Sequence, residues 1–507
     1  MTSERDQAGR AGRGGIAVLG AKVFFVVSGF AQQTLLPRAI GLAGYGALAL
    51  VSVPINILNS VVIASTVQGV SRTIASSHGH ERAAFRSVFR VHLVITAIVA
   101  ALFAALAPAI GAFERAPHIV LPLVLVALVV VAYGVYSPLI GLLNGRGEFT
   151  RQAGLDVTFA IGRTLSLLAV GWLFVHRGWG GTLGATLGWV LAAIAIVPIA
   201  AWLALPLRTG TAGRNVGAAA IPVGAYLKQL LPLAGAQLFT NAVMQIDLML
   251  LGRFLSVNAS ETQVSDEWVG VYKACQLFAF LPYQLLLSIT QVLFPMLARA
   301  KAEGDPVRIR LYVERGARLA AVACGMMVSV LVAVPGSVLR FAYSEDVAAR
   351  GAHTLRILAL GQGSFTMLAI ATTILSSLGR ERIAALITMS ALVVVGAACT
   401  LLTSRASFGQ PQLVATATGT TIGIVVALLT AAREVRKTTG GFVPWVTVAR
   451  VLLALAVAGT IGSFTPTTGR LLTPLVAISV AIVYFVVLGV SRELTRADAH
   501  ALKALRG

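Results

Sequence analysis

Charged side chains are scarce in this sequence. Asp, Glu, Lys and Arg together make up 12% of the 507 residues, whereas hydrophobic residues make up 57%, and the mean hydropathy is +0.85. A soluble domain carries about twice that charged fraction, because a polar shell must cover its core. The shortage of charge therefore excludes an ordinary soluble protein and indicates that lipid surrounds much of the chain.

Cysteine and catalytic motifs are also lacking. The three cysteines, Cys275, Cys324 and Cys399, lie inside apolar segments and share no metal-ligand spacing. We expect them to be buried packing residues and expect no metal site. The sequence has no Walker phosphate loop, no HExxH and no GxSxG motif. These absences predict that the protein is not an enzyme and binds no cofactor, so active transport would draw on an ion or substrate gradient or the membrane potential.

Acidic residues are half as frequent as basic ones. Asp and Glu number 19 against 40 Lys and Arg, which gives a formal net charge of +21. In a soluble protein this excess would suggest nucleic acid, but here the basic residues fall in short clusters between apolar segments. Such clusters follow the positive-inside rule of membrane proteins, and no basic and aromatic surface is assembled. We therefore expect no nucleic-acid partner.

Long hydrophobic runs are what the sequence does contain. They lack two-residue alternation, so they predict helices rather than barrel strands, and each can cross about 30 Å of hydrocarbon at about 1.5 Å per residue. The sequence predicts an all-α polytopic membrane protein with about fourteen transmembrane helices. The expected spans are 15–37, 45–70, 88–113, 119–143, 157–175, 182–203, 227–251, 269–297, 319–341, 353–378, 383–402, 413–430, 442–461 and 472–490.

The charges of the connections test this map independently. With the first tail inside, every even-numbered connection is richer in Lys and Arg than the odd-numbered ones. The odd, outer connections hold only Arg38, Arg115, Arg177, Arg253, Arg340, Arg350, Arg405 and Arg470. An odd number of helices would break this alternation, so we expect an even number and both termini in the cytoplasm.

The organisation along the chain indicates two six-helix lobes and two further helices. A connection rich in Gly, Ala and Thr follows the sixth span and has the composition of a flexible linker. The glycine-rich stretch 41–46 follows a membrane helix rather than a strand, so we interpret it as a tight turn into the second helix. The predicted parts are a cytoplasmic tail 1–14, an N-lobe 15–207, a linker 208–226, a C-lobe 227–432, the last two helices within 433–491 and a cytoplasmic tail 492–507.

A few ionisable residues fall inside the predicted spans. A charge in the bilayer costs about 3 kcal/mol or more, so each is a functional candidate. Arg163 is the deepest cation, and Asp156, two turns earlier on the same helix, is a candidate partner. Asp247 and Lys273 lie near the same side of the membrane and could form a gate or a structural bridge. The candidate set is Lys22, Arg163, Lys273, Arg356 and Arg450, with Asp156 and Asp247; for Lys22, Lys273, Arg356 and Arg450, snorkelling to the headgroups is the alternative.

The sign of this set is informative. Five cations against two carboxylates make the membrane interior net cationic. A cationic cavity suits an anionic substrate, above all a phosphate or diphosphate that Arg can bind through two parallel hydrogen bonds. A cation exporter would need the opposite sign.

Several short segments resemble one bacterial membrane protein family. They are residues 36–41 (LPRAIG), 44–46 (GYG), 247–252 (DLMLLG), 269–274 (VGVYKA) and 293–295 (LFP). They are similar to the Wzx-type polysaccharide flippases of the multidrug/oligosaccharidyl-lipid/polysaccharide (MOP) exporter superfamily. The likeness in length and number of spans covers essentially the whole chain.

This resemblance implies two pseudo-symmetric lobes and alternating access. It implies a monomer that flips an undecaprenyl-diphosphate-linked oligosaccharide for O-antigen, lipopolysaccharide, exopolysaccharide or capsule assembly, beside a polysaccharide polymerase and a chain-length regulator. MurJ-type lipid II flippases are the close alternative, although the first helix (AKVFFVVSGF, residues 21–30) lacks their Arg-rich pattern. MATE-like cation antiporters have twelve helices and an acidic cavity, which counts against them. A membrane glycosyltransferase or ligase would need a larger outer loop than residues 253–268 provide.

Overall fold

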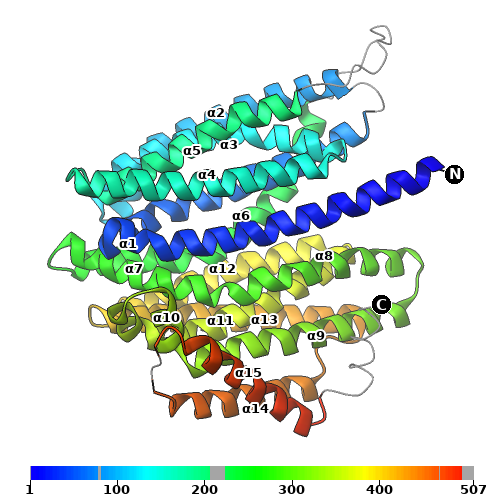
Figure 1. Ribbon diagram of the computed structural model, residues 1–507. Coiled ribbons are helices and arrows are strands. Elements are labelled where there is room, and N and C mark those ends of the chain that lie inside the picture. Colours follow the sequence, from blue (N-terminus) through cyan, green and yellow to red (C-terminus); the bar gives the residue numbers. More distant parts are fainter. Residues whose placement is uncertain (1, 78–80, 206–222, 467–468, 494–507) are drawn as a thin grey trace. The chain divides into compact units, whose positions relative to one another are not determined.

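The computed structural model describes residues 2–77, 81–205, 223–466 and 469–493. Over these residues the chain is helical and contains no strand, which confirms the all-α fold class (Figure 1). The residues group into two compact units, Met1–Gly270 and Val271–Gly507. Most of the predicted linker and of the predicted C-terminal tail lie outside the described residues. The lobe boundaries drawn from the sequence stay a prediction.

Unit 1 is a bundle of long helices around α1 and α3. Its elements are α1 (Thr2–Ala75), α2 (Glu81–Glu114), the short η1 (Pro117–Ile119), α3 (Val120–Gly145), α4 (Phe149–His176), α5 (Gly181–Ala204), α6 (Val223–Asn258) and the first part of α7 (Thr262–Ala279). Helix α1 packs against α3, α4 and α6, and α3 packs against α2 and α5. This arrangement places α4, which carries Arg163, beside α1 and α5.

Helix α1 contains two of the predicted spans. It is interrupted at Gly41, whose φ of 78° and ψ of 162° are not helical. Glycine adopts such a positive φ without the steric cost of a β-carbon. The break lies in the glycine-rich stretch 41–46 and confirms the predicted turn into the second span.

Unit 2 contains the remaining helices and centres on α9, α11 and α13. Its elements are α8 (Leu281–Ala302), α9 (Pro306–Ala333), α10 (Pro335–Ala342), α11 (Glu345–Ser377), α12 (Glu381–Thr403), α13 (Gln410–Thr439), α14 (Trp445–Ser463) and α15 (Thr473–Val490). Helix α11 packs against α8, α9 and α13, and α14 packs against α9 and α15. Side-chain caps fix two of the starts: Asp305 accepts from the Arg308 N–H before α9, and Ser344 accepts from the Val347 N–H before α11.

Twelve helices in the described part of the chain are long and apolar enough to cross a membrane. One of them is α1, whose 56-residue candidate segment is long enough for two crossings at about 1.5 Å per residue. The predicted eighth span, 269–297, is divided between α7 and α8 at Phe280, next to Pro282. Inside a continuous helix Pro282 would remove a backbone hydrogen bond, whereas in the first turn of a helix its missing N–H would have no partner in any case. A new helix that begins here therefore suits the proline. These segments accommodate the fourteen predicted spans.

The faces of α2 show which solvent surrounds the bundle. Its exposed face carries the apolar side chains Val94, Ile98 and Leu102, each more than half exposed. Its buried face carries the polar residues His92 and Thr96. A helix in water would have the opposite pattern, so this face is suited to lipid.

Candidate functional site

Arg163 lies between α4 and α1, and neutral side chains hold it there. Its Nε donates to the Oε1 atom of Gln32 at 3.1 Å. The same oxygen accepts from the Thr164 hydroxyl at 3.4 Å, and Ser28 and Thr164 share a hydrogen bond of 3.1 Å. Gln32 is buried and Arg163 is half-buried. This polar network thus fixes the guanidinium group at Nε, which is one of its five N–H donors.

Aromatic rings surround the same guanidinium group. Its carbon lies 5.3 Å from the centroid of the Phe25 ring and 5.9 Å from that of Phe159. The Tyr133 hydroxyl also interacts with Arg163, and it accepts a hydrogen bond from the indole N–H of Trp189 at 3.1 Å. Ring faces attract a cation electrostatically without neutralising it. Arg163 therefore keeps its full charge.

No described carboxylate forms an ion pair with Arg163. Asp156, the partner that the sequence suggested, has Lys22 and Tyr136 as its electrostatic neighbours instead. Lys22 comes from α1 and Asp156 from α4, so this second contact lies along the same pair of helices. At this interface Asp156 is an electrostatic neighbour of Lys22, and Arg163 has no anionic partner among the described residues.

The structure places the other candidate cations in unit 2. Lys273, on α7, is half-buried and donates to Oε1 of Gln276 at 3.3 Å. Arg356, on α11, donates from Nε to the carbonyl oxygen of Val332 on α9 at 3.0 Å. In unit 1, Asp247 is buried on α6 and accepts from the backbone N–H of Leu248 at 2.8 Å. The pairing of Asp247 with Lys273 stays a prediction.

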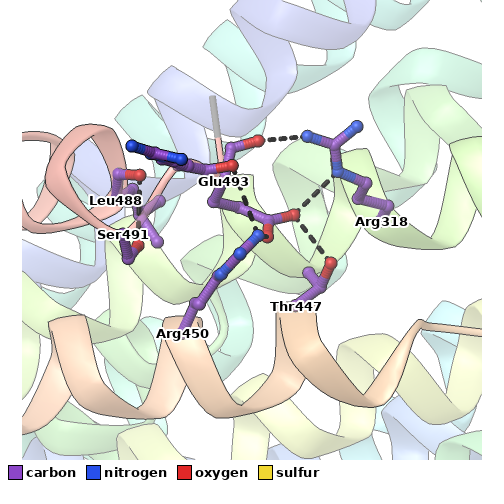
Figure 2. Close-up of polar contacts among 7 residues, drawn as sticks. Arg318, Thr447, Arg450, Leu488, Ser491 and Glu493 are labelled. Atoms are coloured by element: carbon purple, nitrogen blue, oxygen red, sulfur yellow. Dashed lines mark hydrogen bonds and ion pairs between the residues drawn. The ribbon is translucent and has the colours of Figure 1, made fainter. Parts of the chain in front are cut away.

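Arg450 belongs to a cluster at the end of the last helix rather than to a group of cations. Its guanidinium group bonds to Oε2 of Glu493 at 2.8 Å, and Arg318 bonds to Oε1 of the same residue at 2.7 Å (Figure 2). The Thr447 hydroxyl donates to Oε1 at 2.6 Å. Burial alone would raise the pKa of Glu493, but hydrogen bonds from Thr447, Arg450 and Arg318 outweigh it and hold the pKa below its usual value. The cluster ties α9, α14 and the residues after α15 together.

Sequence patterns miss the neutral members of the Arg163 environment. Ser28 and Gln32 are one helical turn apart on α1, and this spacing of polar side chains within an apolar run is the signal that could have found them. Tyr133 and Trp189 carry no such signal, because an aromatic residue inside a span is ordinary. Which helices face one another decides their role, and the sequence does not reveal this.

One family model matches the chain over residues 35–348, and its description is polysaccharide biosynthesis protein. No curated protein is similar enough to the sequence to count as a match. The matched region runs from the end of the first predicted span into unit 2. It includes Arg163 and its neighbours on α3, α4 and α5, whereas the neighbours on α1 (Phe25, Ser28 and Gln32) precede it.

Solved structures share the fold at low sequence identity. The lipid II flippase MurJ in an inward closed conformation has a TM-score of 0.71 at 12% identity, covering 94% of this chain and 98% of that one. A multidrug resistance MATE family transporter of the MOP superfamily, inward-facing, has a TM-score of 0.61 at 14% identity, with 84% and 99% covered. A mutant of the Vibrio cholerae MATE transporter VcmN has a TM-score of 0.58 at 16% identity, with 86% and 98% covered. These structures confirm the expected MOP fold and a multi-pass membrane protein.

Proposed function

The chain belongs to the polysaccharide biosynthesis protein family, and on this premise we propose that it is a flippase for a polyprenyl-diphosphate-linked oligosaccharide. It moves the lipid-linked repeat unit across the bacterial cytoplasmic membrane by alternating access. The protein acts as a transporter and not as an enzyme. Both termini are cytoplasmic, and a polysaccharide polymerase and a chain-length regulator act beside it.

The observation that carries the proposal is the state of Arg163. A half-buried guanidinium group inside a span has only neutral partners, although a charge in the bilayer is costly. An anionic ligand supplies the missing negative charge. A diphosphate fits because its oxygens accept two parallel hydrogen bonds from the terminal guanidinium nitrogens. Lys22, one α1 turn before Phe25, adds a second cation along the same helices.

The other ionisable candidates take lesser parts in this proposal. Lys273 and Arg356 stay predictions as anion-binding residues of unit 2. Arg450 is engaged by Glu493 and contributes structure. Asp156, an electrostatic neighbour of Lys22, and Asp247 stay candidates for gating or ion coupling.

Complementation of a bacterial strain that lacks its own polysaccharide flippase tests the proposal. The readout is the accumulation of lipid-linked precursor, with protein amounts in the membrane measured in parallel. The unaltered chain relieves the accumulation, and Arg163→Ala does not. Arg163→Lys restores only part of the activity, because an ammonium group lacks the planar pair of donors. If the unaltered chain leaves the precursor in place, the flippase assignment is wrong.

Arg405 provides a matched control. It is an exposed arginine between α12 and α13 for which no hydrogen bond or ion pair is found in the described residues. Arg405→Ala removes the same charge from the chain and keeps full activity. Wild-type activity in Arg163→Ala would refute the site while leaving the flippase assignment intact.

A second candidate substrate is lipid II. The fold likeness to MurJ, whose TM-score exceeds those of the MATE transporters, favours this alternative. Lipid II presents the same diphosphate to Arg163, so the site does not separate the two cargoes. Rescue of cells depleted of their lipid II flippase identifies this activity. We expect rescue only in the polysaccharide assay, since the chain belongs to the polysaccharide family.

A further inference from the structure

Glu114 is a fully buried carboxylate without hydrogen-bond partners. It is the last residue of α2, its side chain is 0% exposed, and neither of its oxygens has a partner in the described part of the chain. The helix ends here because Arg115 adopts a left-handed φ of 53°. An ionised carboxylate in such a place loses its hydration and gains nothing in return, at a cost of several kcal/mol.

A second buried carboxylate lies close enough to act on Glu114. Asp266, on α7, is 4% exposed, and its negative charge is the electrostatic neighbour of Glu114. Its Oδ2 atom lies 2.9 Å from Nε2 of His118, whereas its Oδ1 atom has no partner. Burial raises the pKa of Asp266, and the hydrogen bond from His118 partly opposes this. Two neighbouring carboxylates in one dry site cannot both remain ionised at low cost.

Among the described residues, no arginine or lysine forms an ion pair with either carboxylate, and His118 is the basic group beside Asp266. From α6, Arg253 donates to the Phe113 carbonyl oxygen at 2.8 Å and lies 4.6 Å from the centroid of the Phe113 ring, so its described bonds go elsewhere. Gly252 of the same helix borders the Glu114 carboxylate together with the apolar Leu50 of α1. From η1 comes His118, one-third exposed, and the adjacent Arg115 side chain is exposed.

We propose that Glu114 and Asp266 form a proton-binding site, and that His118 connects it to water. A proton from the aqueous phase binds one carboxylate and forms a carboxylic acid, which lowers the charge of the pair from −2 to −1. The exposed edge of His118 allows the proton to enter and leave.

The position of Asp266 links this proton to the fold of unit 1. A β-carbon placed on Gly46 of α1 would lie 2.7 Å from the Asp266 carbonyl carbon, so the α7 backbone is in close contact with α1 at one of the two carboxylate residues. Loss of the proton places two like charges beside this helix crossing and weakens it. The proton is in this way suited to couple flipping to a pH gradient, a step that rests on the proposed flippase function, whereas proton binding itself does not.

Labelling with dicyclohexylcarbodiimide tests the site on the purified full-length chain in lipid nanodiscs, without any cargo. This apolar reagent modifies protonated carboxyl groups in dry surroundings, and peptide mass spectrometry identifies the modified residue. At pH 7 we expect at least tenfold more label on Glu114 than on Glu261, an exposed acid just before α7. Equal labelling of the two residues overturns the proposal.

Two variants sharpen the test. Asp266→Asn removes the neighbouring charge and lowers the pH midpoint of Glu114 labelling, whereas Glu261→Gln leaves it unchanged. An unchanged midpoint in a folded, monodisperse Asp266→Asn protein contradicts the shared site. If sodium at fixed pH and ionic strength reduces the labelling of Glu114, the site binds a metal cation, and the proposal of a proton site is wrong. If Glu114 is labelled as expected but the chain fails in the complementation assay, the proton-binding site is supported and only the flippase function is refuted.

Discussion

Gly46 and Asp266 bring α1 and α7 into backbone contact. A β-carbon on Gly46 would lie 2.7 Å from the Asp266 carbonyl carbon and 2.8 Å from the Gly270 nitrogen. Gly270 faces the same crossing, since its own β-carbon would lie 2.7 Å from the Leu42 carbonyl oxygen. The two glycines belong to segments 44–46 and 269–274, both of which are among the segments that resemble the flippase family.

The first prediction concerns this crossing. Gly46→Val forces the α1 and α7 backbones apart and should cost about 1–3 kcal/mol, as overpacking generally does. The apparent melting temperature in detergent should fall by several degrees. Gly29→Ala is the control, because no atom lies within 4 Å of the added β-carbon; it should keep or slightly raise stability. Equal melting temperatures for both variants would contradict the close contact.

Gln32 offers a second prediction, about the placement of Arg163. Gln32→Leu keeps the size of the side chain but removes the oxygen that accepts from Arg163 Nε at 3.1 Å. Leaving this donor unpaired costs about 1–3 kcal/mol and frees the guanidinium group to move. We expect partial loss of flipping in the precursor assay with normal amounts of protein in the membrane. Full activity would mean that the aromatic rings alone position Arg163.

Glu493 supports a third prediction, on acid stability. Glu493→Gln removes the charge bound by Arg318 and Arg450, whose side chains are each 31% exposed while that of Glu493 is 2% exposed. Solvent screening of the arginines reduces the loss below the 3–5 kcal/mol of a fully buried pair, to about 1–3 kcal/mol. Faster proteolysis between α13 and α14 and a lower melting temperature should follow.

The pH dependence of this contribution has a defined sign. Because the pKa of Glu493 is held below its usual value, the stabilisation is fully present above the unfolded pKa of about 4.3 and is lost as the pH falls through the folded pKa. The difference in melting temperature between the unaltered chain and Glu493→Gln should therefore be constant from pH 5 to pH 8 and shrink below pH 4. A difference that grows in acid would contradict this account.

A buried histidine supports a fourth prediction. His92 of α2 bonds through Nδ1 to the Thr66 hydroxyl at 3.2 Å and through Nε2 to the Tyr226 hydroxyl at 2.6 Å, which ties α6 to α1 and α2. Tyr226→Phe should cost about 1–2 kcal/mol, since a buried ring nitrogen loses its partner. Tyr312→Phe is the control, because no hydrogen bond to its hydroxyl is found in the described residues. Comparable unfolding midpoints for the two variants would show that the His92 bond contributes little.

The fifth prediction tests the orientation in the membrane. All three native cysteines are buried, so single added cysteines report cleanly on accessibility. Thr150 and Ser404 are both exposed, in an even-numbered and an odd-numbered connection respectively. A membrane-impermeant maleimide should label Ser404→Cys in intact cells with a permeabilised outer envelope, but Thr150→Cys only after lysis. The reverse pattern would invert the topology.

Depth along a helix could be predicted from the sequence, and orientation around it could not. The spans and the turn at Gly41 follow from hydropathy and glycine chemistry, and the structure contains both. Arg163 was placed inside a span by counting residues from the start of its helix. Its partner Gln32 lies 131 residues away, and no local pattern connects the two.

The missed carboxylates have a related explanation. Glu114 follows an apolar run and looks like an ordinary interfacial residue, but it is 0% exposed and lies beside Gly252 of α6 and Leu50 of α1. Asp156 was a candidate partner of Arg163 because the two are two turns apart on one helix, whereas Lys22 of α1 is the electrostatic neighbour that the structure gives it. The burial of Glu114 and the neighbour of Asp156 both depend on contacts between helices. These contacts join residues that are far apart in the sequence, so local sequence patterns do not reveal them.

The cluster around Glu493 has a consequence for how the protein is made. Arg318 leaves the ribosome 175 residues before the carboxylate that binds it. During translation, α9 and α14 can already be inserted while their arginines still lack this partner. An early stop codon directly ahead of Glu493 would therefore yield a chain that carries every described helix but lacks the carboxylate that joins α9 and α14 to the end of α15. Proteases of the membrane would have time to remove such a chain.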